Sequence, residues 1–536
     1  MSNKPIELKM FLAFLCLCLV SYASIIFQTH PANPDAQYII PTLIESGNLT
    51  GYIGKLLNLK TLDLQPVRDL SLAFDLFVFN KTGFHISIFH NLVLWSLSAI
   101  IAFRILIFLY PTFQKKALFL ILSLYLTYPL FTQTLAWGVS RKHLLAYFFT
   151  LLITDRWLKN CQHFNFKNFL FITLFYTFAV FSQPIALLWP LWAITYSYDK
   201  TSFKLLAGSL IIMIGGVYLN FLYYSQSPLF LSLYSSKTNE LQELPDKILG
   251  LGHYTFQLLF PYLLSLSYSL GHWSTLVGIA LLVVLLFGMI KSKVAKKTLL
   301  TWVTFSILPL GIVLSKSTML YDTYLLLPAF GLLVLICSFK KVQAPGAVAE
   351  KLMVIGLVLF MGLSFKEAGY WKNDVLLSER NFENRPDCRT AYDYLMSHYL
   401  SGEAPPSPEA KNYLYNYDCG KQNIAGLTLI NLQSYMLYFE QDFSNPERLE
   451  KLQKLSERAV LPAILLVAFL IREDKEEEAK EALDNLILRY GKTKFMPIYI
   501  PLADIKVKPF CEKQEEKGCL RFLDAFIQKP SAFQYK

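Results

Sequence analysis

Five short polar segments interrupt a chain that is otherwise strongly apolar, and they hold the residues best suited to chemistry. They lie around Asp35, over 128–145, at 182–184, over 253–268 and at 321–324. Polar groups near a bilayer are costly and are usually kept where they bind or react. If these segments reach the same side of a membrane, they form one candidate active site.

A carboxylate and two cations have the clearest chemistry among these residues. Asp35 follows the first apolar run, and an acid held there by burial can act as a general base. Arg141 and Lys142 begin a later apolar run, where basic side chains can hold a phosphate by charge and hydrogen bonds. Asp35 with Arg141 therefore fits transfer of a group from a phosphate-bearing lipid. The alternatives are an ordinary loop carboxylate and basic side chains that snorkel from the membrane.

The composition is that of a membrane protein. Of 536 residues, 54% are hydrophobic and 17% are charged, whereas a soluble domain has about a quarter charged. Apolar runs of about 20 residues, enough to span a bilayer, recur until about residue 370, and the remainder is polar. We therefore predict an all-α protein with a polytopic membrane domain at 1–370 and a soluble helical domain at 371–536.

The basic clusters predict the direction of each span and account for the net charge of +11. Because they lie between apolar runs, they indicate topology and argue against nucleic-acid binding. With the N-terminus in the cytoplasm, about eleven spans place every cluster inside. External loops then lie at 28–83 and 224–272, and the C-terminal domain is extracytoplasmic. The expected spans are about 9–27, 85–108, 117–135, 143–155, 167–181, 184–197, 205–223, 273–290, 298–314, 320–338 and 351–366.

One stretch leaves that topology open. If residues 253–270 spanned the membrane, the lysines at 291–297 would be external, against the positive-inside tendency. If the stretch lies in the interface or re-enters, those lysines are cytoplasmic. The second arrangement is the one that satisfies all the basic clusters.

The cysteines of the tail give independent support for an external C-terminal domain. They are Cys388, Cys419, Cys511 and Cys519, an even number, as disulfides in an oxidising compartment require. Proximity in sequence suggests the pairs Cys388–Cys419 and Cys511–Cys519. Four free thiols in a cytoplasmic tail are the alternative.

The tail is predicted to be helical and similar to a tetratricopeptide solenoid. Helices are expected at 449–459, 463–472 and 475–490, and in the last of these Ala479, Leu483 and Leu486 form one apolar face. A repeat consensus of about 34 residues is not visible. The domain is interpreted either as a platform for an acceptor or partner, or as a lid or stabilising cap.

Motifs of other catalytic classes do not occur in the sequence. There is no Walker loop, dinucleotide fingerprint, nucleophile elbow or HExxH zinc motif. His85 and His90 lie five positions apart at the start of an expected span. They do not share a helix face well, so packing is favoured over metal binding.

Several motifs occur in an order that is typical of one family. The best match is Ala136-Trp137-Gly138-Val139-Ser140-Arg141-Lys142, and the others are Asp35 before Tyr38-Ile39, Gln65-Pro66-Val67 next to Arg68, Gly83-Phe84-His85, Ser182-Gln183-Pro184 and Asp322-Thr323-Tyr324. Over roughly residues 10–390 the chain resembles bacterial relatives of the transmembrane and tetratricopeptide-repeat-containing O-mannosyltransferases. These belong to the C-class of membrane glycosyltransferases.

The resemblance implies a hexosyltransferase that acts with inversion. It would move mannose or a similar sugar from a polyprenyl-phosphate donor to a protein or glycan acceptor outside a bacterial inner membrane, without a cofactor. It implies that Asp35 is the catalytic residue, which acts as a base or otherwise engages the acceptor, and that Arg141, Lys142 and Arg68 are ligands of the donor phosphate. The substrate-binding residues that it implies are Tyr38, Gln65, Gln183, Asp322 and Tyr324.

The chain departs from the family pattern inside this site. Pro34 replaces the first acid of an acidic pair, and the family's basic residues are replaced at Gln65, Gln183, Tyr128 and Thr323. Loss of the acidic pair argues against a bound divalent metal. The departures indicate either a different donor or lost activity, so an inactive scaffold for cell-envelope assembly is the alternative function. A transporter is disfavoured because the spans hold few polar residues at depth.

Overall fold

The computed structural model is all-α within the residues that it describes. These are residues 4–26, 49–57, 64–82, 86–160, 166–196, 244–261, 273–291, 295–316, 321–384, 388–401, 446–457 and 460–490, with scattered positions between them. No strand occurs in these ranges. The predicted fold class is therefore confirmed at the level of helix content.

The chain forms two compact units. Unit 1 comprises Met1–Pro34, Asp63–Ser227 and Asn239–Arg380, and unit 2 comprises Asp35–Leu62, Pro228–Thr238 and Asn381–Lys536. The last division lies within one helix, α21 (Asp374–Asn384), whereas the sequence places the boundary after residue 370. Parts of both predicted external loops belong to unit 2.

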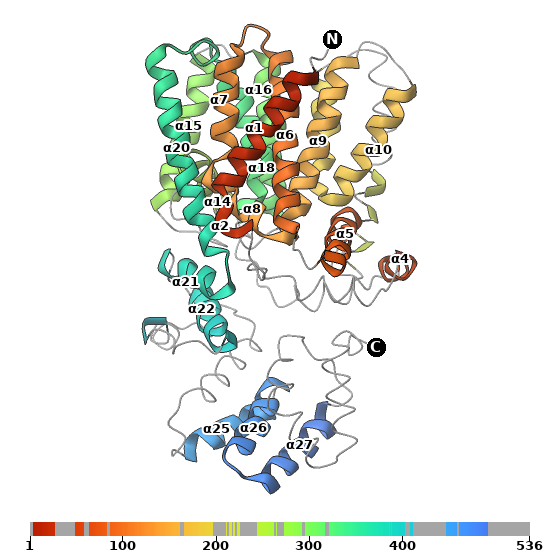
Figure 1. The fold of residues 1–536 in the computed structure, drawn as a ribbon, viewed down its shortest axis with the longest axis vertical. Coiled ribbons are helices and arrows are strands. Elements are labelled where there is room, and N and C mark those ends of the chain that lie inside the picture. The colour runs from red at the N-terminus through yellow and green to blue at the C-terminus, as the bar shows by residue number, and fades with distance from the viewer. Residues whose placement is uncertain are drawn as a thin grey trace. The chain divides into compact units, whose positions relative to one another are not determined.

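The helices of unit 1 follow the apolar runs of the sequence. In chain order they are α1 (Lys4–Ser21), α2 (Ala23–Ile26), α5 (Pro66–Thr82), α6 (Ser87–Leu109), α7 (Lys115–Leu126), η1 (Pro129–Phe131), α8 (Thr132–Ala136), η2 (Gly138–Ser140), α9 (Arg141–Asn160), α10 (Phe166–Ser182), η3 (Pro184–Leu188), α11 (Trp189–Tyr196), α14 (Leu244–Leu259), α15 (Trp273–Lys291), α16 (Lys296–Trp302), η4 (Val303–Ile307), α17 (Leu308–Lys316), η5 (Asp322–Leu325), α18 (Leu326–Cys337), α19 (Lys340–Gln343) and α20 (Ala347–Tyr370). In Figure 1, α1, α6, α7, α9, α10, α16, α18 and α20 form an upright bundle.

Among the described residues of unit 1, two helices are long and apolar enough to cross a membrane. They are α6 and α20. A third span results if α7 is joined to Pro129–Ala136, which is bent from it by 45°. Shorter apolar helices such as α10 and α15 occupy other expected spans, and 205–223 lies mostly outside the described residues. The expected number of about eleven spans is not confirmed.

The outward faces of α20 need an apolar solvent. Only 6% of its apolar window is buried inside the protein, whereas 56% of the window of α6 is buried. Val354, Ile355 and Leu359 are among its large exposed side chains. A water-exposed helix with this surface would be an aggregation hazard, so α20 is suited to contact with lipid.

Aromatic side chains form much of the interior of unit 1, and several of their polar ends are hydrogen-bonded. The indole N–H of Trp95 donates to the Leu126 carbonyl oxygen at 3.1 Å, and that of Trp189 donates to Thr154 Oγ1 at 3.0 Å. Such pairing removes the cost of burying an indole N–H. Helices α14 and α15 pack closely at Gly252 and Gly278, where a Cβ on Gly278 would lie 1.8 Å from the Gly252 carbonyl oxygen.

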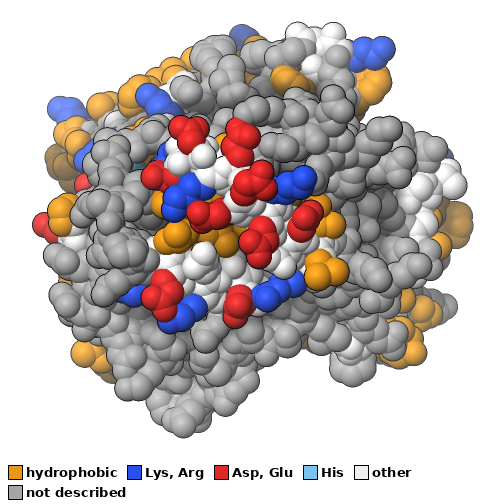
Figure 2. Space-filling view, turned by 90° about the horizontal axis from the view of Figure 1, so that it is seen from below, with side chains coloured by type: hydrophobic (Ala, Val, Ile, Leu, Met, Phe, Trp, Pro, Cys, Tyr) orange, Lys and Arg blue, Asp and Glu red, His pale blue; other side chains and the backbone are white. Residues whose placement is uncertain are grey.

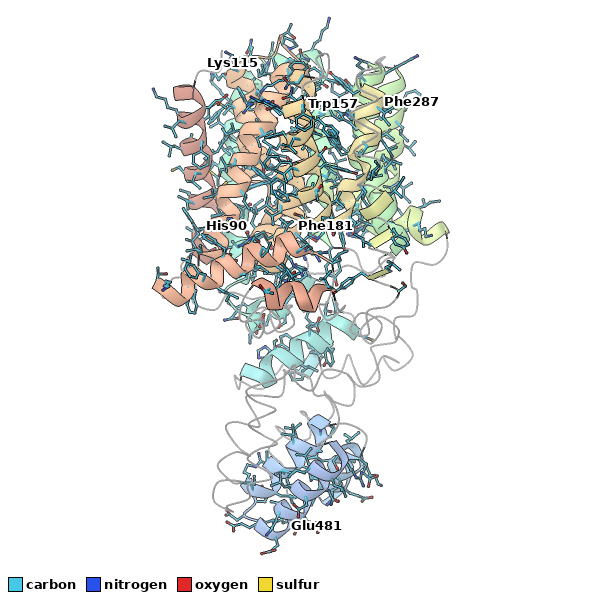
Figure 3. The ribbon with its side chains drawn as sticks, turned by 90° about the vertical axis from the view of Figure 1, so that its right-hand side faces the viewer. His90, Lys115, Trp157, Phe181, Phe287 and Glu481 are labelled. Atoms are coloured by element: carbon cyan, nitrogen blue, oxygen red, sulfur yellow. The ribbon has the colours of Figure 1, made fainter. Side chains whose placement is uncertain are left out.

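Labelled side chains mark the two ends of the bundle in unit 1. Lys115 and Trp157 lie at one end in Figure 3, and His90 and Phe181 lie at the other. Near the first end, Asp155 pairs with Arg104 at 2.6 Å and with Lys159 at 2.8 Å.

Unit 2 contains a compact group of tail helices. The helices that the structure describes in this unit are α4 (Leu49–Leu57), α22 (Cys388–Ser401), α25 (Pro446–Ser456), α26 (Val460–Arg472) and α27 (Glu476–Tyr490). Helix α26 packs against both α25 and α27. These helices agree in position with those expected at 449–459, 463–472 and 475–490.

The outer surface of the tail helices is charged. Glu476, Glu477 and Glu478 are exposed in the first turn of α27, where carboxylates interact favourably with the helix dipole. Figure 2 shows acidic and basic side chains mixed on one face of the molecule. A mixed surface of this kind is typical of a solvated helix face.

Candidate functional site

Several of the polar segments that the sequence singles out contact one another in unit 1. The rings of Trp137 and Tyr321 lie 6.2 Å apart. The backbone N–H of Tyr321 donates to the Tyr254 hydroxyl at 3.1 Å, and the Tyr128 hydroxyl donates to the Leu258 carbonyl oxygen at 3.1 Å. Segments 128–145, 253–268 and 321–324 therefore converge, as expected if they line one site.

Helix α5 brings a further set of polar side chains to this group. Gln65, Arg68 and Asp69 are all buried. The Arg68 guanidinium donates through Nη1 to Gln65 Oε1 at 2.8 Å and through Nε to Asp69 Oδ1 at 2.7 Å. Gln65 in turn donates through Nε2 to Gln183 Oε1 at 3.4 Å. Three residues that the family resemblance implies, Gln65, Arg68 and Gln183, are thus neighbours.

The charge of Arg68 is paired with that of a carboxylate. Its Nη2 lies 2.6 Å from Asp69 Oδ1, and both side chains are almost fully buried. Because the ion pair is neutral overall, its electrostatic pull on a phosphate is weaker than that of an isolated guanidinium. Lys142 is half-buried at the start of α9 and is the other basic group of the predicted phosphate set.

Arg141 is enclosed by acceptors of the protein itself. Its side chain is 0% exposed, and its Nη2 lies 2.5 Å from Asp75 Oδ2. Its Nε donates to Asn91 Oδ1 at 2.6 Å, and its Nη1 donates to the Ser71 carbonyl oxygen at 3.2 Å. Nη2 also donates to the carbonyl oxygen and to Oγ of Ser87, each at 2.8 Å. In this structure, Arg141 joins α5, α6 and α9.

The partner of Arg141 is itself held by a histidine. Asp75 Oδ1 lies 3.0 Å from Nδ1 of His90, whose side chain is 26% exposed. Burial acts to raise the pKa of Asp75, but the hydrogen bond with His90 and the charge of Arg141 outweigh it. The pKa of Asp75 therefore lies below its ordinary value, and the carboxylate is ionised at neutral pH.

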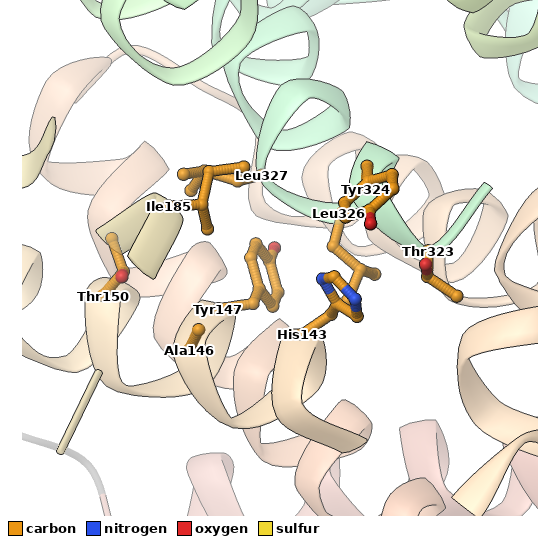
Figure 4. A pocket seen from close by; sticks show the side chains of 9 residues that line it. All are labelled: His143, Ala146, Tyr147, Thr150, Ile185, Thr323, Tyr324, Leu326 and Leu327. Carbon is orange, nitrogen blue, oxygen red and sulfur yellow. The ribbon is translucent and has the colours of Figure 1, made fainter. Parts of the chain in front are cut away.

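A small pocket opens between α9 and the 321–324 segment. Its lining includes His143, Tyr147, Ile185, Thr323 and Tyr324 (Figure 4). The His143 and Tyr324 rings meet edge to face with centroids 5.0 Å apart. The cavity volume is about 10 Å³, roughly the space of one water molecule.

The remaining predicted site residues are divided between buried and undescribed positions. Asp322 is 1% exposed, next to Thr323 in η5. Asp35 and Tyr38 lie outside the described residues, so their predicted roles stay predictions. Within the part of the chain that the structure describes, no group of three or more His, Cys, Asp or Glu side chains has the arrangement of a metal site.

The sequence did not identify the acceptors that surround Arg141. Ser71, Asp75, Ser87 and Asn91 lie 50 or more positions before Arg141 in the chain, and serine and asparagine are common in loops and helix starts. A local signal existed for α5 itself. Leu70, Phe74 and Phe77 follow helical spacing, which favours a helix inside the predicted loop 28–83.

The structure tests the prediction of disulfides in the tail at one cysteine. Cys388 is disulfide-bonded, whereas Cys16, Cys18 and Cys337 are free thiols. The other cysteines of the tail, Cys419, Cys511 and Cys519, lie outside the described residues. A disulfide at Cys388 is typical of an oxidising compartment, and its pairing with Cys419 stays a prediction.

Comparison with known proteins does not identify a family. No protein-family model matches the sequence, and no curated protein matches it. The resemblance to the membrane O-mannosyltransferases therefore depends on the motifs quoted above.

Proposed function

We propose that the protein is a membrane glycosyltransferase of the C-class type. It moves mannose or a similar sugar from a polyprenyl-phosphate donor to an extracytoplasmic protein or glycan acceptor, with inversion at the anomeric carbon. The observation that supports this most is the convergence of segments 128–145, 253–268 and 321–324 with the buried polar face of α5 at one end of a helical bundle.

In the proposed reaction, a carboxylate from the first loop acts as the base, and basic groups near the membrane surface bind the phosphate. Asp35 accepts the proton of the acceptor hydroxyl as that oxygen bonds to the anomeric carbon. The bond between this carbon and the phosphate oxygen breaks on the opposite face, and polyprenyl phosphate leaves. Arg68 and Lys142 bind the phosphate and the charge that it gains. The assignment of Asp35 derives from the family resemblance alone.

Arg141 has a different role in this proposal from the one that the resemblance implies. All three of its nitrogens face acceptors of α5 or α6 that lie 50 or more positions away in the chain, whereas the partners of Arg68 described above, Gln65 and Asp69, are its near neighbours in sequence. Arg141 could turn to a phosphate only by releasing the contacts that join two other helices to α9. We therefore assign Arg141 as a positioning residue, which holds α5 and its Arg68 against the start of α9.

The proposed topology has about eleven spans, with the N-terminus in the cytoplasm of a bacterium and unit 2 outside. It is supported by the end of the bundle near Lys115, where two cations, Arg104 and Lys159, share one carboxylate, Asp155, and by the disulfide at Cys388. The tail acts as a platform for the acceptor or for a partner. Its helical pairs α25–α26 and α26–α27 provide a surface of the type used by solenoids.

Sugar transfer by the purified protein in lipid vesicles tests the proposal. A panel of polyprenyl-phosphate sugars, mannose first, is offered to the wild type and to Asp35→Asn and Arg68→Gln. We expect Asp35→Asn to slow release of polyprenyl phosphate by about 10²-fold or more, and Arg68→Gln to slow it by about 10-fold to 10²-fold.

A matched control comes from the other end of the bundle. Arg104 also pairs with an aspartate, Asp155, but it is remote from the site, so Arg104→Gln should leave the transfer rate within about twofold. Wild-type protein that is folded yet inert across the donor panel would refute the enzyme and favour the scaffold. Equal rates for wild type and Asp35→Asn would refute the assignment of the base.

A further inference from the structure

Helix α5 buries charged side chains on one face and exposes large apolar side chains on the opposite face. The inward face holds Arg68, Asp69 and Asp75, all buried, beside Leu72. The outward face holds Leu70, Phe74 and Phe77, which are 46%, 55% and 59% exposed. A helix on a water-facing surface has the opposite arrangement, because burial of apolar area is the favourable term.

The outward side chains form one continuous stripe. Leu70, Phe74 and Phe77 lie at spacings of four and three residues, and Lys81 follows after four more, so all four share one face of the helix. The Lys81 Nζ lies 5.9 Å from the centre of the Phe77 ring. Aromatic groups that end in a lysine are typical of helices at the boundary between lipid headgroups and acyl chains.

The stripe is continuous with the surface of a helix that is able to span a membrane. The Phe74 ring lies 6.2 Å from the His90 ring of α6, and Asp75 pairs with the same histidine. The neighbouring Phe89, in the first turn of α6, is 39% exposed. If α6 crosses the bilayer, its first turn lies at the bilayer surface, and the stripe of α5 lies at the same depth.

The orientation of α5 agrees with this position. In Figure 3, α5 runs across the ends of the upright helices near His90 and Phe181. It contacts α9 and α10, which leaves its opposite side free of the bundle. A helix that crosses the bundle in this direction can lie in the plane of a membrane surface.

We propose that the outward stripe of α5, formed by Leu70, Phe74 and Phe77, docks into the interfacial layer of the lipid bilayer. This inference rests on the membrane embedding of unit 1 and not on the transfer reaction. It places Arg68 about one helix diameter, roughly 10 Å, from the lipid. The bilayer then helps to hold the polar face of α5 against α9 and α10.

Photocrosslinking in lipid vesicles tests this docking surface. The photoreactive p-benzoylphenylalanine is placed at Phe74 or at Phe77, where it replaces a ring of similar shape, in full-length protein in vesicles of phosphatidylethanolamine and phosphatidylglycerol. Two exposed leucines serve as references: Leu359, 60% exposed on α20, and Leu488, 82% exposed on α27. Mass spectrometry counts the lipid adducts.

The expected result is a lipid adduct at Phe74, Phe77 and Leu359, with yields at least about tenfold above that at Leu488. Adducts at Leu359 without any at Phe74 or Phe77 would overturn the proposal while leaving the membrane span intact. Crosslinks from Phe74 or Phe77 to a second copy or to another protein, in place of lipid, would also overturn it. A lack of adducts at Leu359 as well would refute the membrane embedding itself.

Discussion

Replacing Asp75 with asparagine is expected to lower the free energy of unfolding of unit 1 by about 3 kcal/mol. The change removes the carboxylate charge that lies 2.5 Å from Arg141 Nη2. It keeps the size of the side chain. Because Arg141 is 0% exposed, its guanidinium then remains buried without a counter-charge. Breaking a buried ion pair on one side costs about 3–5 kcal/mol.

We expect the lower end of that range of unfolding free energies because Arg141 keeps its other hydrogen bonds. Its contacts with Asn91, Ser71 and Ser87 survive the substitution. Each hydrogen bond to a charged group is worth about 1.5–3 kcal/mol, so the cluster should weaken without separating. Arg141→Lys should cost at least as much, because one ammonium group cannot reach acceptors on three sides.

Denaturant titration of the detergent-solubilised protein, followed by the near-ultraviolet signal of its buried tryptophans, measures these free energies. Lys116→Gln is the control, since it breaks an exposed ion pair with Glu350 between α7 and α20. That change should cost less than about 1 kcal/mol. A cost for Asp75→Asn no larger than that of Lys116→Gln would refute the role assigned to the Arg141 cluster.

Three further predictions concern pH, the disulfide and helix packing. Because the pKa of Asp75 lies below its ordinary value, the stability that it provides is full above about pH 4 and is lost as the pH falls through the lower folded value; the difference between wild type and Asp75→Asn should therefore shrink in acid titrations. Cys388→Ser should cost unit 2 about 2–4 kcal/mol, and in unreduced protein Cys388 should resist alkylation until reductant is added. Gly278→Ala should cost about 1–3 kcal/mol in the same titration, because its Cβ meets the Gly252 carbonyl oxygen, whereas Gly311→Ala, with no atom within 4 Å, should be neutral or stabilising.

The sequence predicted the helices whose apolar residues form long uninterrupted runs. The span expected at 85–108 is α6, Ser87–Leu109, and the one expected at 167–181 is α10, Phe166–Ser182. The expected span at 117–135 is bent instead, because Pro129 cannot continue the hydrogen bonds of α7 and disfavours helical geometry at Tyr128. Apolar content alone does not reveal a bend of this kind.

The candidate site was predicted less completely, because its contacts join distant parts of the chain. The sequence placed Gln65 and Gln183 in one site, and they are neighbours although 118 positions apart. It also interpreted Arg141 as a phosphate ligand, since a basic residue at a helix start has that potential. The acceptors that enclose it come from α5 and α6, and no local pattern shows which side chains will face a guanidinium after folding.

The Arg141 cluster also has a consequence for the biogenesis of the protein. Asp75 and Asn91 precede Arg141 in the chain, so in the proposed topology the first spans are inserted before the guanidinium that pairs with Asp75 is in place. Since an unpaired buried charge is strongly unfavourable, α5 cannot settle on the nascent bundle until α9 has emerged. Late docking of this helix would act as a checkpoint, at which chains truncated before residue 141 remain open to proteolysis.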